Sequence, residues 1–442
     1  MIDFGFSREV ITPKRGIGLA GYFNHRPNRG VLDDLYVRAL LMEKDGVTAG
    51  FLVYDLCFLT VEAVEEIRKA VRAAGFAFAD NLIYSAIHTH TGPQFSEFFG
   101  LPYNPEYVEV LKAQSVAAVE TAAANLAPGE LLVATGTENP FAFVRRYWMK
   151  NGTVVTNPGR NNPDVVKPES EFDRTVSVLA VRQEGRLAAV MVNLANHTDT
   201  IDGDLVSADW PGRMERDIQD ALGEDVPVLT MIDPSGDINH FDLAADFNQS
   251  CYAEARRIGA GYAKIVLGLL KKLAPVAADR IEVSTRRIEI PYRTIPADKL
   301  AAAEKLLATV PDEQESGSMT SEGIASGSGA VARFFAASLV EYARVCSGTS
   351  RTFDLTAVKL GKELAFESLP GEPFNGIARA IRAKSPFAKT VIVSLAQGEC
   401  GYIAMPECFD RGGYEVLPVV GGSPREDTAE RLIAEALANL NA

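Results

Sequence analysis

The chain has 442 residues, of which 47% are hydrophobic and 23% charged, as in an ordinary globular protein that can bury a sizeable core. Its formal net charge of -14 argues against nucleic acid as a partner, because phosphate backbones are bound by clustered positive charge. No run approaches the roughly 18 apolar residues of a membrane span, so we expect no transmembrane segment. No secretory signal is visible and the five cysteines form no paired pattern, so we expect a cytoplasmic protein.

Strand-like runs and amphipathic helical patterns are interleaved along the chain. We expect strands at residues 35–42, 50–58, 82–88, 131–136, 176–182, 188–195, 226–232, 281–291, 352–360, 363–368 and 390–395. We expect helices at residues 61–74, 106–125, 211–222, 251–270, 297–308, 329–345, 373–383 and 428–440. Because the order lacks a strict βαβ rhythm, we predict an α/β fold of the mixed α+β kind, with mixed β-sheets covered by outer helices.

We expect residues 1–442 to form a single large domain, since no linker or internal repeat is visible. One stretch, residues 311–329, is unusually rich in Gly and Ser. Such a stretch is typical of a mobile surface loop, and an active-site lid is the sharper alternative.

Histidine is scarce, with five in the chain, and several follow strand-like runs. His88 and His90 lie two residues apart in the run H-T-H-T-G-P. On an extended backbone both rings would project from the same face, and neutral imidazole is the commonest metal ligand. The pattern favours a metal site. His197 follows another apolar run, where a structural role is equally expected.

Two acidic turns are further candidates. Glu372 lies in a Pro-Gly-Glu turn before an expected helix that opens with Pro373, so it is either a helix-capping group or a carboxylate metal ligand. Asp237 lies in the turn D-P-S-G-D after a strand-like run, where its carboxylate could orient a histidine. Neither pattern decides between these readings by itself.

The H-T-H-T-G-P run closely resembles the H-T-H-S-G-P motif of the neutral, non-lysosomal ceramidases, zinc amidases that cleave N-acyl sphingosine. The resemblance covers roughly residues 5–420 and keeps the order of the family's motifs. The matching residues are His197 followed by Val206-Ser207-Ala208-Asp209, the run Pro370-Gly371-Glu372, the pair Tyr402 and Tyr414, and Arg145, with Arg146 as the alternative.

The resemblance implies a site with one zinc ion (Zn2+) per chain and a zinc-dependent hydrolase that cleaves an amide bond. The implied zinc ligands are His88, His197, Glu372 and Tyr402. With zinc in such a site, we expect His90 to act as proton shuttle, Arg145 and Tyr414 as oxyanion donors, and Asp237 and Asn239 as orienting groups. We expect a small-molecule or acyl-amide substrate other than ceramide. An ester or lactone hydrolase with the same site, or a non-catalytic zinc- or ligand-binding descendant, are the alternatives.

The chain departs from the family in two places. Asn239 replaces the serine of the family's G-D-V-S-P-N segment, and asparagine cannot form an acyl-enzyme. The ceramidases also carry a C-terminal β-sandwich domain and a secretion signal, so we expect a divergent member that consists of the catalytic region. His240 could line the pocket, and His25 could reach the site or lie in an exposed loop.

Overall fold

The computed structural model of the chain describes residues 1–22, 25–96, 103–309, 329–419 and 422–442. The Gly/Ser-rich loop expected at residues 311–329 therefore lies outside the described residues, except for Gly329, which begins helix α7 (Gly329–Val345). No helix in these described ranges is long and apolar enough to cross a lipid bilayer.

In the described part of the chain, the largest sheet is mixed and has the strand order β14-β12-β11-β6-β1-β3-β4-β5, with β16 beside β6. Its strands are β1 (Ile2–Val10), β3 (Tyr36–Lys44), β4 (Val47–Tyr54), β5 (Leu82–Ala86), β6 (Ala127–Gly136), β11 (Val176–Gln183), β12 (Arg186–Leu194), β14 (Val228–Ile232) and β16 (Ala274–Pro275). The pairs β4·β5 and β12·β14 are parallel, and the other pairs are antiparallel.

A second mixed sheet has the order β17-β18-β19-β21. Its strands are β17 (Ile281–Pro291), β18 (Ser350–Leu360), β19 (Leu364–Ser368) and β21 (Lys389–Val393). The inner faces of the two sheets share one hydrophobic core, to which Phe51 of β4, Val192 of β12 and Phe366 of β19 all contribute. The sheets also meet at their ends, where the Ser394 N–H donates to the carbonyl of Ile232 at 2.9 Å.

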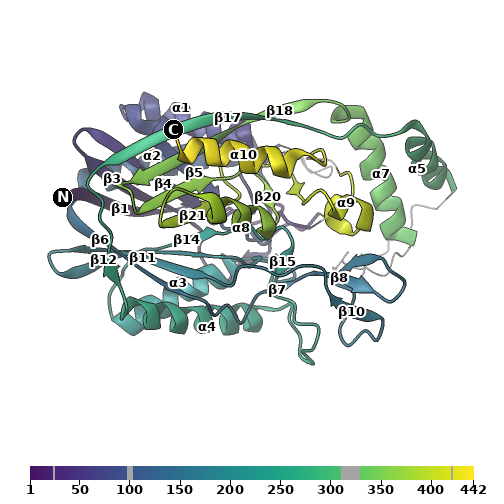
Figure 1. Cartoon of the computed structure of the whole chain (residues 1–442), viewed down its shortest axis with the longest axis horizontal. Helices are drawn as coiled ribbons and strands as arrows, with labels where there is room; N and C mark the ends of the chain where they lie inside the picture. The colour runs from purple at the N-terminus through teal and green to yellow at the C-terminus, as the bar shows by residue number, and fades with distance from the viewer. Residues whose placement is uncertain (23–24, 97–102, 310–328, 420–421) are drawn as a thin grey trace.

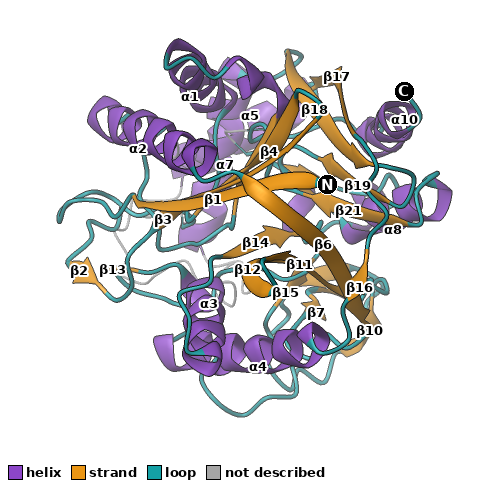
Figure 2. Cartoon of the chain, turned by 90° about the vertical axis from the view of Figure 1, so that its left-hand side faces the viewer, coloured by secondary structure: helices purple, strands orange, loops and turns teal. Residues whose placement is uncertain are grey.

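Helices cover the outer faces of both sheets, as Figure 2 shows. Helix α2 packs on β1 and β3 with α1 beside it, while α3 and α4 pack together under β6 and β11. Helices α8 and α10 cover the second sheet, and α5 and α7 pack on each other at the far end of the molecule (Figure 1). The helices are α1 (Val61–Ala73), α2 (Pro105–Ala124), α3 (Asp209–Leu222), α4 (Tyr252–Leu270), α5 (Ala297–Thr309), α8 (Asn375–Lys384), α9 (Cys408–Arg411) and α10 (Thr428–Leu440). The predicted mixed α/β architecture is confirmed.

Local sequence signals explain where the first helices begin. Thr60 caps α1 by accepting the N–H of Ala63, and Asn104 caps α2 by accepting the N–H of Tyr107. Pro105 follows Asn104 at the first helical position, where its missing N–H costs nothing. Helix α1 follows the carboxyl end of β4, and helix α2 follows the carboxyl end of β5.

Short strand pairs organise the loops between the two sheets. They are β2 (Gly30–Val31) with β13 (Leu205–Val206), β7 (Phe143–Val144) with β15 (Ile238–Asn239), β20 (Glu372–Pro373) with β22 (Tyr402–Ile403), and β8 (Arg146–Met149) with β9 (Val154–Thr156) and β10 (Val165–Pro168). Short 3-10 helices lie at Ala77–Asn81 and Tyr414–Val416. Each pair gives a loop the fixed backbone position of a strand.

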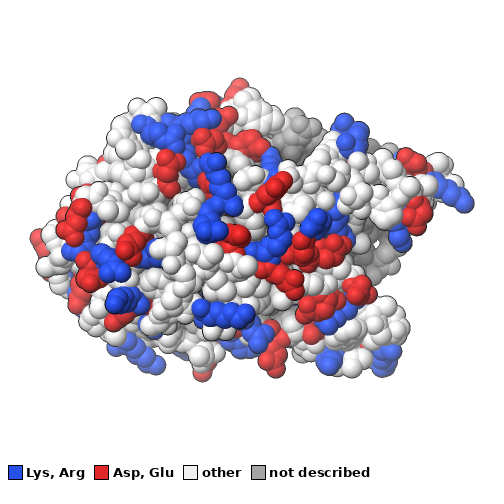
Figure 3. All heavy atoms as spheres, turned by 45° about the horizontal axis from the view of Figure 1, so that its top comes forward, with Lys and Arg blue, Asp and Glu red and all other residues white. Residues whose placement is uncertain are grey.

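Basic and acidic side chains are interspersed over the face drawn in Figure 3. The excess negative charge of the chain is therefore not gathered into a single patch on that face. Mixed charge of this kind keeps a surface hydrated without creating a strong local field.

Candidate metal centre and active site

Several strands end at the same place in the fold, and their following residues form the site. His88 follows β5, His197 follows β12, and Glu372 lies beyond the end of β19. The ends are tied by backbone hydrogen bonds, since the N–H of Ala86 donates to the carbonyl of Leu395 at 3.1 Å. Loops at the carboxyl ends of strands are a usual location for ligand sites, because a rigid scaffold positions them.

The His-Thr-His run is not extended, so the expectation that one strand face carries both rings is wrong. Strand β5 ends at Ala86, and His88 has the left-handed φ of 70°. The resulting turn still brings the rings of His88 and His90 together, with centroids 4.8 Å apart and planes at 87°. The left-handed backbone is rare for a non-glycine residue, and such strain is often found at functional sites.

Three predicted zinc ligands converge on one point. The Nε2 atoms of His88 and His197 lie 3.0 Å apart, and Nε2 of His88 lies 3.3 Å from Oε2 of Glu372. Both imidazoles are buried, and the ligand atoms of the three residues all lie within 4.8 Å of one another. Ligands at ordinary zinc bond lengths in a tetrahedral site are about 3.3 Å apart, so this spacing suits zinc.

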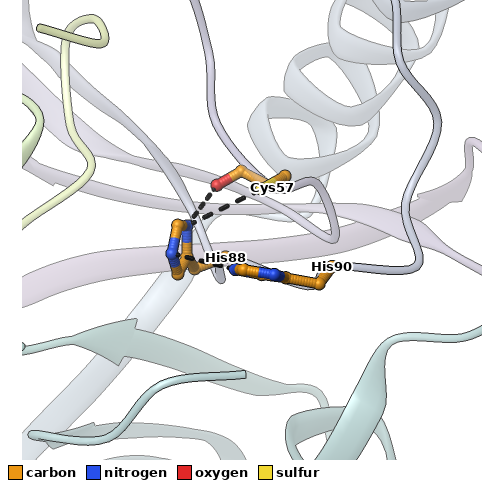
Figure 4. A group of neighbouring side chains, drawn as sticks. All are labelled: Cys57, His88 and His90. Carbon is orange, nitrogen blue, oxygen red and sulfur yellow. Dashed lines mark hydrogen bonds between the residues drawn. The ribbon is translucent and has the colours of Figure 1, made fainter. Parts of the chain in front are cut away.

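The hydrogen bond made by Nδ1 of His88 determines which of its two nitrogens can bind a metal. Nδ1 of His88 donates to the carbonyl of Cys57 at 2.8 Å, so Nε2 is the nitrogen available to a metal (Figure 4). The Cys57 thiol lies 3.8 Å from the same Nδ1, on the edge of the ring that already has a partner. Burial also raises the pKa of the Cys57 thiol, which disfavours the thiolate that a metal requires. Of the two candidate ligand groups, His88 with His197 and Glu372 therefore fits a metal better than Cys57 with His88 and His90.

Glu372 provides an independent test of the fit. Its Oε2 is buried and has no hydrogen-bond partner among the described residues. Leaving a buried carboxylate oxygen unsatisfied is costly, and a bound cation would remove that cost. Glu372 is the register partner of Tyr402 in the parallel pair of β20 and β22, which places the predicted fourth ligand beside it. The donor set of two imidazoles, a carboxylate and a phenol fits zinc.

His197 is held by its backbone. Its N–H donates to Oδ1 of Asn196 at 2.8 Å, and its carbonyl accepts the Nε1–H of Trp210 at 2.9 Å. Burial lowers the pKa of His197 well below its usual value, and the neighbouring His88 and Arg145 act in the same direction. The imidazole is therefore neutral at pH 7, the form that binds a metal.

The structure separates the two candidate arginines. The Arg145 guanidinium lies 5.0 Å from the centre of the Tyr402 ring and 6.0 Å from that of Tyr414. Those two rings are themselves 5.5 Å apart. Nη2 of Arg145 is buried and has no hydrogen-bond partner in the part of the chain that the structure describes. Arg146 points elsewhere, to Glu169 at 2.5 Å and Glu415 at 2.6 Å, so Arg145 is the arginine that lies beside the two tyrosines.

Glu415 holds Arg145 in place, and the sequence did not point to it. Its carboxylate lies between two arginines, 2.8 Å from Nε of Arg145 and 2.6 Å from Nη1 of Arg146. The side chain is fully buried, and burial would raise its pKa, but the two arginines hold the pKa below its usual value. Thr156 donates a further hydrogen bond at 2.8 Å. The carboxylate is thus ionised and fixed.

His90 lies beside the three converging ligands without being one of them. Its Nε2 is 3.3 Å from Nε2 of His88, and its Nδ1 is 3.4 Å from Oδ1 of Asp199. Burial lowers the pKa of His90 well below its usual value, so the imidazole is neutral at pH 7. Gly21, with a φ of 92°, lies so close that a Cβ there would be 2.5 Å from Cγ of His90. Neither Asp199 nor Gly21 was predicted from the sequence to be a neighbour of His90.

The predicted orienting residues hold backbone segments. Asp237 accepts the N–H of Asn375 at 2.7 Å through its carboxylate and the N–H of Arg145 at 3.0 Å through its carbonyl. Asn239 donates to Oδ1 of Asn157 at 2.9 Å and accepts the N–H of Phe241 at 3.1 Å. Asp237 thus positions the start of α8 and the residue Arg145 between β7 and β8. Among the described residues its contacts do not include the histidine partner that we expected.

The two remaining histidines differ in their environments. His240 is buried, its Nε2–H donates to the carbonyl of Gln249 at 2.8 Å, and burial lowers its pKa to about 4. His25 is exposed in the loop beside Gly18. The exposed-loop interpretation of His25 therefore fits the structure.

Sequence comparison alone identifies no relative of the chain, since no protein-family model and no curated protein matches it. Solved structures do match. A neutral ceramidase from Pseudomonas aeruginosa has a TM-score of 0.73 at 17% identity, and the match covers 99% of this chain and 74% of that chain. A ceramidase complexed with C2 has a TM-score of 0.75 at 16% identity, with the same coverage of both chains. The resemblance predicted from the motifs is thus confirmed at the level of the fold: the chain folds like a neutral ceramidase.

Proposed function

We propose that this protein is a zinc-dependent hydrolase that cleaves the amide bond of an acyl-amide substrate with an activated water molecule. The observation that carries the proposal is the convergence of His88, His197 and Glu372, with a buried carboxylate oxygen that lacks a hydrogen-bond partner among the described residues. The likeness of the fold to neutral ceramidase supports the same reaction class. Fold alone does not define an activity, whereas the residues of a site do.

The proposed zinc ligands are His88, His197, Glu372 and Tyr402. Zinc in such a site supplies Lewis acidity, which polarises a carbonyl oxygen and lowers the pKa of water towards about 7. The cation would also neutralise the buried Glu372 carboxylate. The tyrosine is the least common ligand of the four, and its register pairing with Glu372 supports its inclusion.

His90 is the proposed proton shuttle. The Nε2 atom of His90 faces the converging ligands, so a water molecule bound there would lie beside this nitrogen. In its neutral form it can accept a proton from that water and then donate it to the leaving nitrogen, a contribution of roughly 100- to 10,000-fold in rate. The leaving amine is a poor leaving group unless it is protonated, so amide cleavage requires this second transfer.

Arg145 and Tyr414 are the proposed donors to the oxyanion of the tetrahedral intermediate. Arg145 offers a buried Nη2 that has no protein partner among the residues described. A well-placed donor of this kind contributes about 3 kcal/mol to the transition state. Asn239 holds Asn157 and Phe241 through its amide, and an asparagine cannot form an acyl-enzyme, so the proposed nucleophile is a water molecule.

The test uses the full-length protein as purified. We expect about one zinc per chain by elemental analysis, and turnover of an N-acyl amide. Glu372→Ala should lose both zinc and activity, whereas the matched control Glu407→Ala, at an exposed position, should keep both. Protein without zinc, or a fully active Glu372→Ala variant, would contradict the proposal.

Paired substrates with the same acyl group separate the alternatives. An amide hydrolase should cleave both the N-acyl amide and the O-acyl ester, since esters are intrinsically easier to hydrolyse. Turnover of the ester or a lactone alone would assign the ester hydrolase instead. Binding of zinc and ligand without any turnover would assign a non-catalytic protein. Retention of His90, Arg145 and Tyr414, which are not needed merely to hold a metal, argues against that last outcome.

A further inference from the structure

We propose that Asp199 is a positioning residue for His90, and that Tyr22 and Arg26 hold Asp199 in that role. The inference rests on the proposed function, because it concerns the histidine that would carry the proton. It adds a group that the zinc-site motifs do not contain.

The His90 ring has one nitrogen towards each neighbour. Nε2 lies 3.3 Å from Nε2 of His88, at the converging ligands. Nδ1 is buried and makes no hydrogen bond within the described ranges, and Oδ1 of Asp199 lies 3.4 Å from it. A buried imidazole nitrogen without a partner is costly, and the Asp199 carboxylate is the acceptor within reach.

Asp199 is itself fixed by Tyr22, against whose ring Arg26 packs. The Tyr22 hydroxyl donates a short hydrogen bond to the Asp199 oxygen that faces His90. The Arg26 guanidinium lies over the Tyr22 ring, 4.0 Å from its centre, and donates to the carbonyls of Ala20 and of His90, the latter at 2.7 Å. Burial raises the pKa of the Asp199 carboxyl to about 7, while the Tyr22 hydroxyl and the Arg26 guanidinium act in the opposite direction. Tyr22 also meets the His90 ring edge-on, with centroids 5.5 Å apart.

The backbone fastens the two loops that carry this pair. The N–H of His90 donates to the carbonyl of Thr198 at 3.1 Å, and the hydroxyl of Thr198 donates to the carbonyl of Ile87 at 2.6 Å. Asp199 therefore cannot move away from His90 without breaking bonds on both sides. The exposed fractions of the His90 and Asp199 side chains are 11% and 13%, so water competes little for their contact.

This placement has a direct chemical consequence. If Nδ1 carries its proton towards Asp199, the lone pair is on Nε2, where a water proton can be taken. The imidazolium formed in that step is stabilised by the Asp199 carboxylate, which neither gains nor loses a proton. Donation of the Nε2 proton to the leaving nitrogen restores the neutral ring. An aspartate that orients a catalytic histidine in this way is worth up to about 10,000-fold in kcat in the serine proteases.

The first test measures the ring directly and does not depend on activity. With five histidines in the chain, nitrogen-15 NMR of histidine-labelled protein is assignable, and His90→Gln identifies the His90 signals by their loss. We expect His90 to be protonated at Nδ1 in the native protein, and Asp199→Asn to shift that signal and populate the other tautomer. Protonation of His90 at Nε2, or an unchanged spectrum in Asp199→Asn, would overturn the inference even if the protein is a zinc amidase.

The second test separates positioning from metal binding. Asp199→Asn should lower kcat by about 100-fold or more, with KM changed by less than about threefold and the zinc content unchanged. Tyr22→Phe, which removes the donor to Asp199, should lower kcat by roughly tenfold. Asp202→Asn, an exposed carboxylate on the same loop, is the matched control and should have normal kcat. A zinc-loaded Asp199→Asn enzyme with kcat within about threefold of the native value would overturn the inference. A native protein without zinc or turnover would instead refute the proposed function. In that case the NMR result alone would decide the role of Asp199.

Discussion

Glu372 and Tyr402 are direct register partners in the short parallel pair of β20 and β22. The two predicted ligands are thirty positions apart in the sequence, yet their backbones lie side by side, with the N–H of Glu372 bonded to the carbonyl of Gly401 at 3.0 Å. Partner residues in a sheet project from the same face, so one backbone contact places both side chains. The relative position of these ligands is therefore set by the backbone.

Gly371 makes this approach of two backbones feasible, which leads to the first prediction. Its φ is 60°, and a Cβ there would lie 2.5 Å from Sγ of Cys400 and 2.6 Å from the carbonyl oxygen of Gly401. Gly371→Ala should force β20 from β22 and weaken zinc binding by at least tenfold, measured by competition with a chelator. Gly223→Ala is the control, since its φ is 66° with nothing within 4 Å of a Cβ. Equal zinc affinity in the two variants would refute the argument.

Substitutions of the neighbouring Arg145 and Arg146 should have different effects, the first on kcat and the second on stability. Arg145→Lys keeps the charge but loses the planar donor group, so kcat should fall by about 100-fold while the free energy of unfolding changes little. Arg146→Gln should instead destabilise the fold by about 3–5 kcal/mol, because it leaves the buried carboxylates of Glu169 and Glu415 with one cation fewer. Steady-state kinetics and urea denaturation of both variants provide the measurements. The reverse assignment of the phenotypes would show that Arg146 is the residue of the site.

Gly21 tests the close contact with His90. The variant Gly21→Ala places a Cβ 2.5 Å from Cγ of His90, so the ring must move and kcat should fall by at least tenfold with zinc retained. Gly16→Ala has nearly the same φ, 94° against 92°, and nothing within 4 Å of its Cβ. Both variants carry a left-handed alanine, at a cost of about 1 kcal/mol, and only the first meets His90. Equal kcat in the two variants would contradict this contact.

A buried glutamate that is not one of the site residues predicts a pH dependence of stability. Glu367 is fully buried, and burial raises its pKa well above the usual value, although Asn439 and Lys359 act in the opposite direction. A raised pKa in the folded state means that the unfolded chain releases this proton first as the pH rises. The contribution of Glu367 to stability is therefore complete below about pH 4.5 and is lost as the pH rises through the raised value.

Glu367→Gln should remove that loss and keep an acceptor for the amide of Asn439, which lies 3.1 Å from Oε1. The free energy of unfolding of the native protein, measured in urea from pH 4.5 upwards, should fall relative to that of the variant. A difference between the two proteins that is constant with pH, or that changes in the opposite direction, would refute the assignment.

The sequence predicted the mixed fold and the residues that converge, but not how they converge. The spacing of His88 and His90 suggested a strand face, whereas a left-handed residue makes the contact instead. Strand β1 was missed, although it is central to the largest sheet. Gly5 interrupts its pattern, because a Cβ there would lie 1.9 Å from the carbonyl of Ala122, so close packing by α2 excludes the side chain that would have signalled a strand.

The supporting residues of the site were also beyond the sequence. Asp199 lies two positions after His197 in the run H-T-D, which is a signal that could have been considered. Tyr22 and Glu415 give no such signal, because their contacts with Asp199 and Arg145 join segments that are 177 and 270 positions apart. Short sequence motifs identify candidate ligands, whereas the groups that orient these ligands are brought to them by tertiary packing.

The most direct measurement of the central claim is anomalous diffraction at the zinc absorption edge from crystals of the protein as purified. The account predicts one strong peak per chain, within about 2.0–2.2 Å of Nε2 of His88, Nε2 of His197 and a carboxylate oxygen of Glu372. The phenol oxygen of Tyr402 should lie at a similar distance. A peak between Cys57 and His90, or no peak at these residues in active protein, would contradict it.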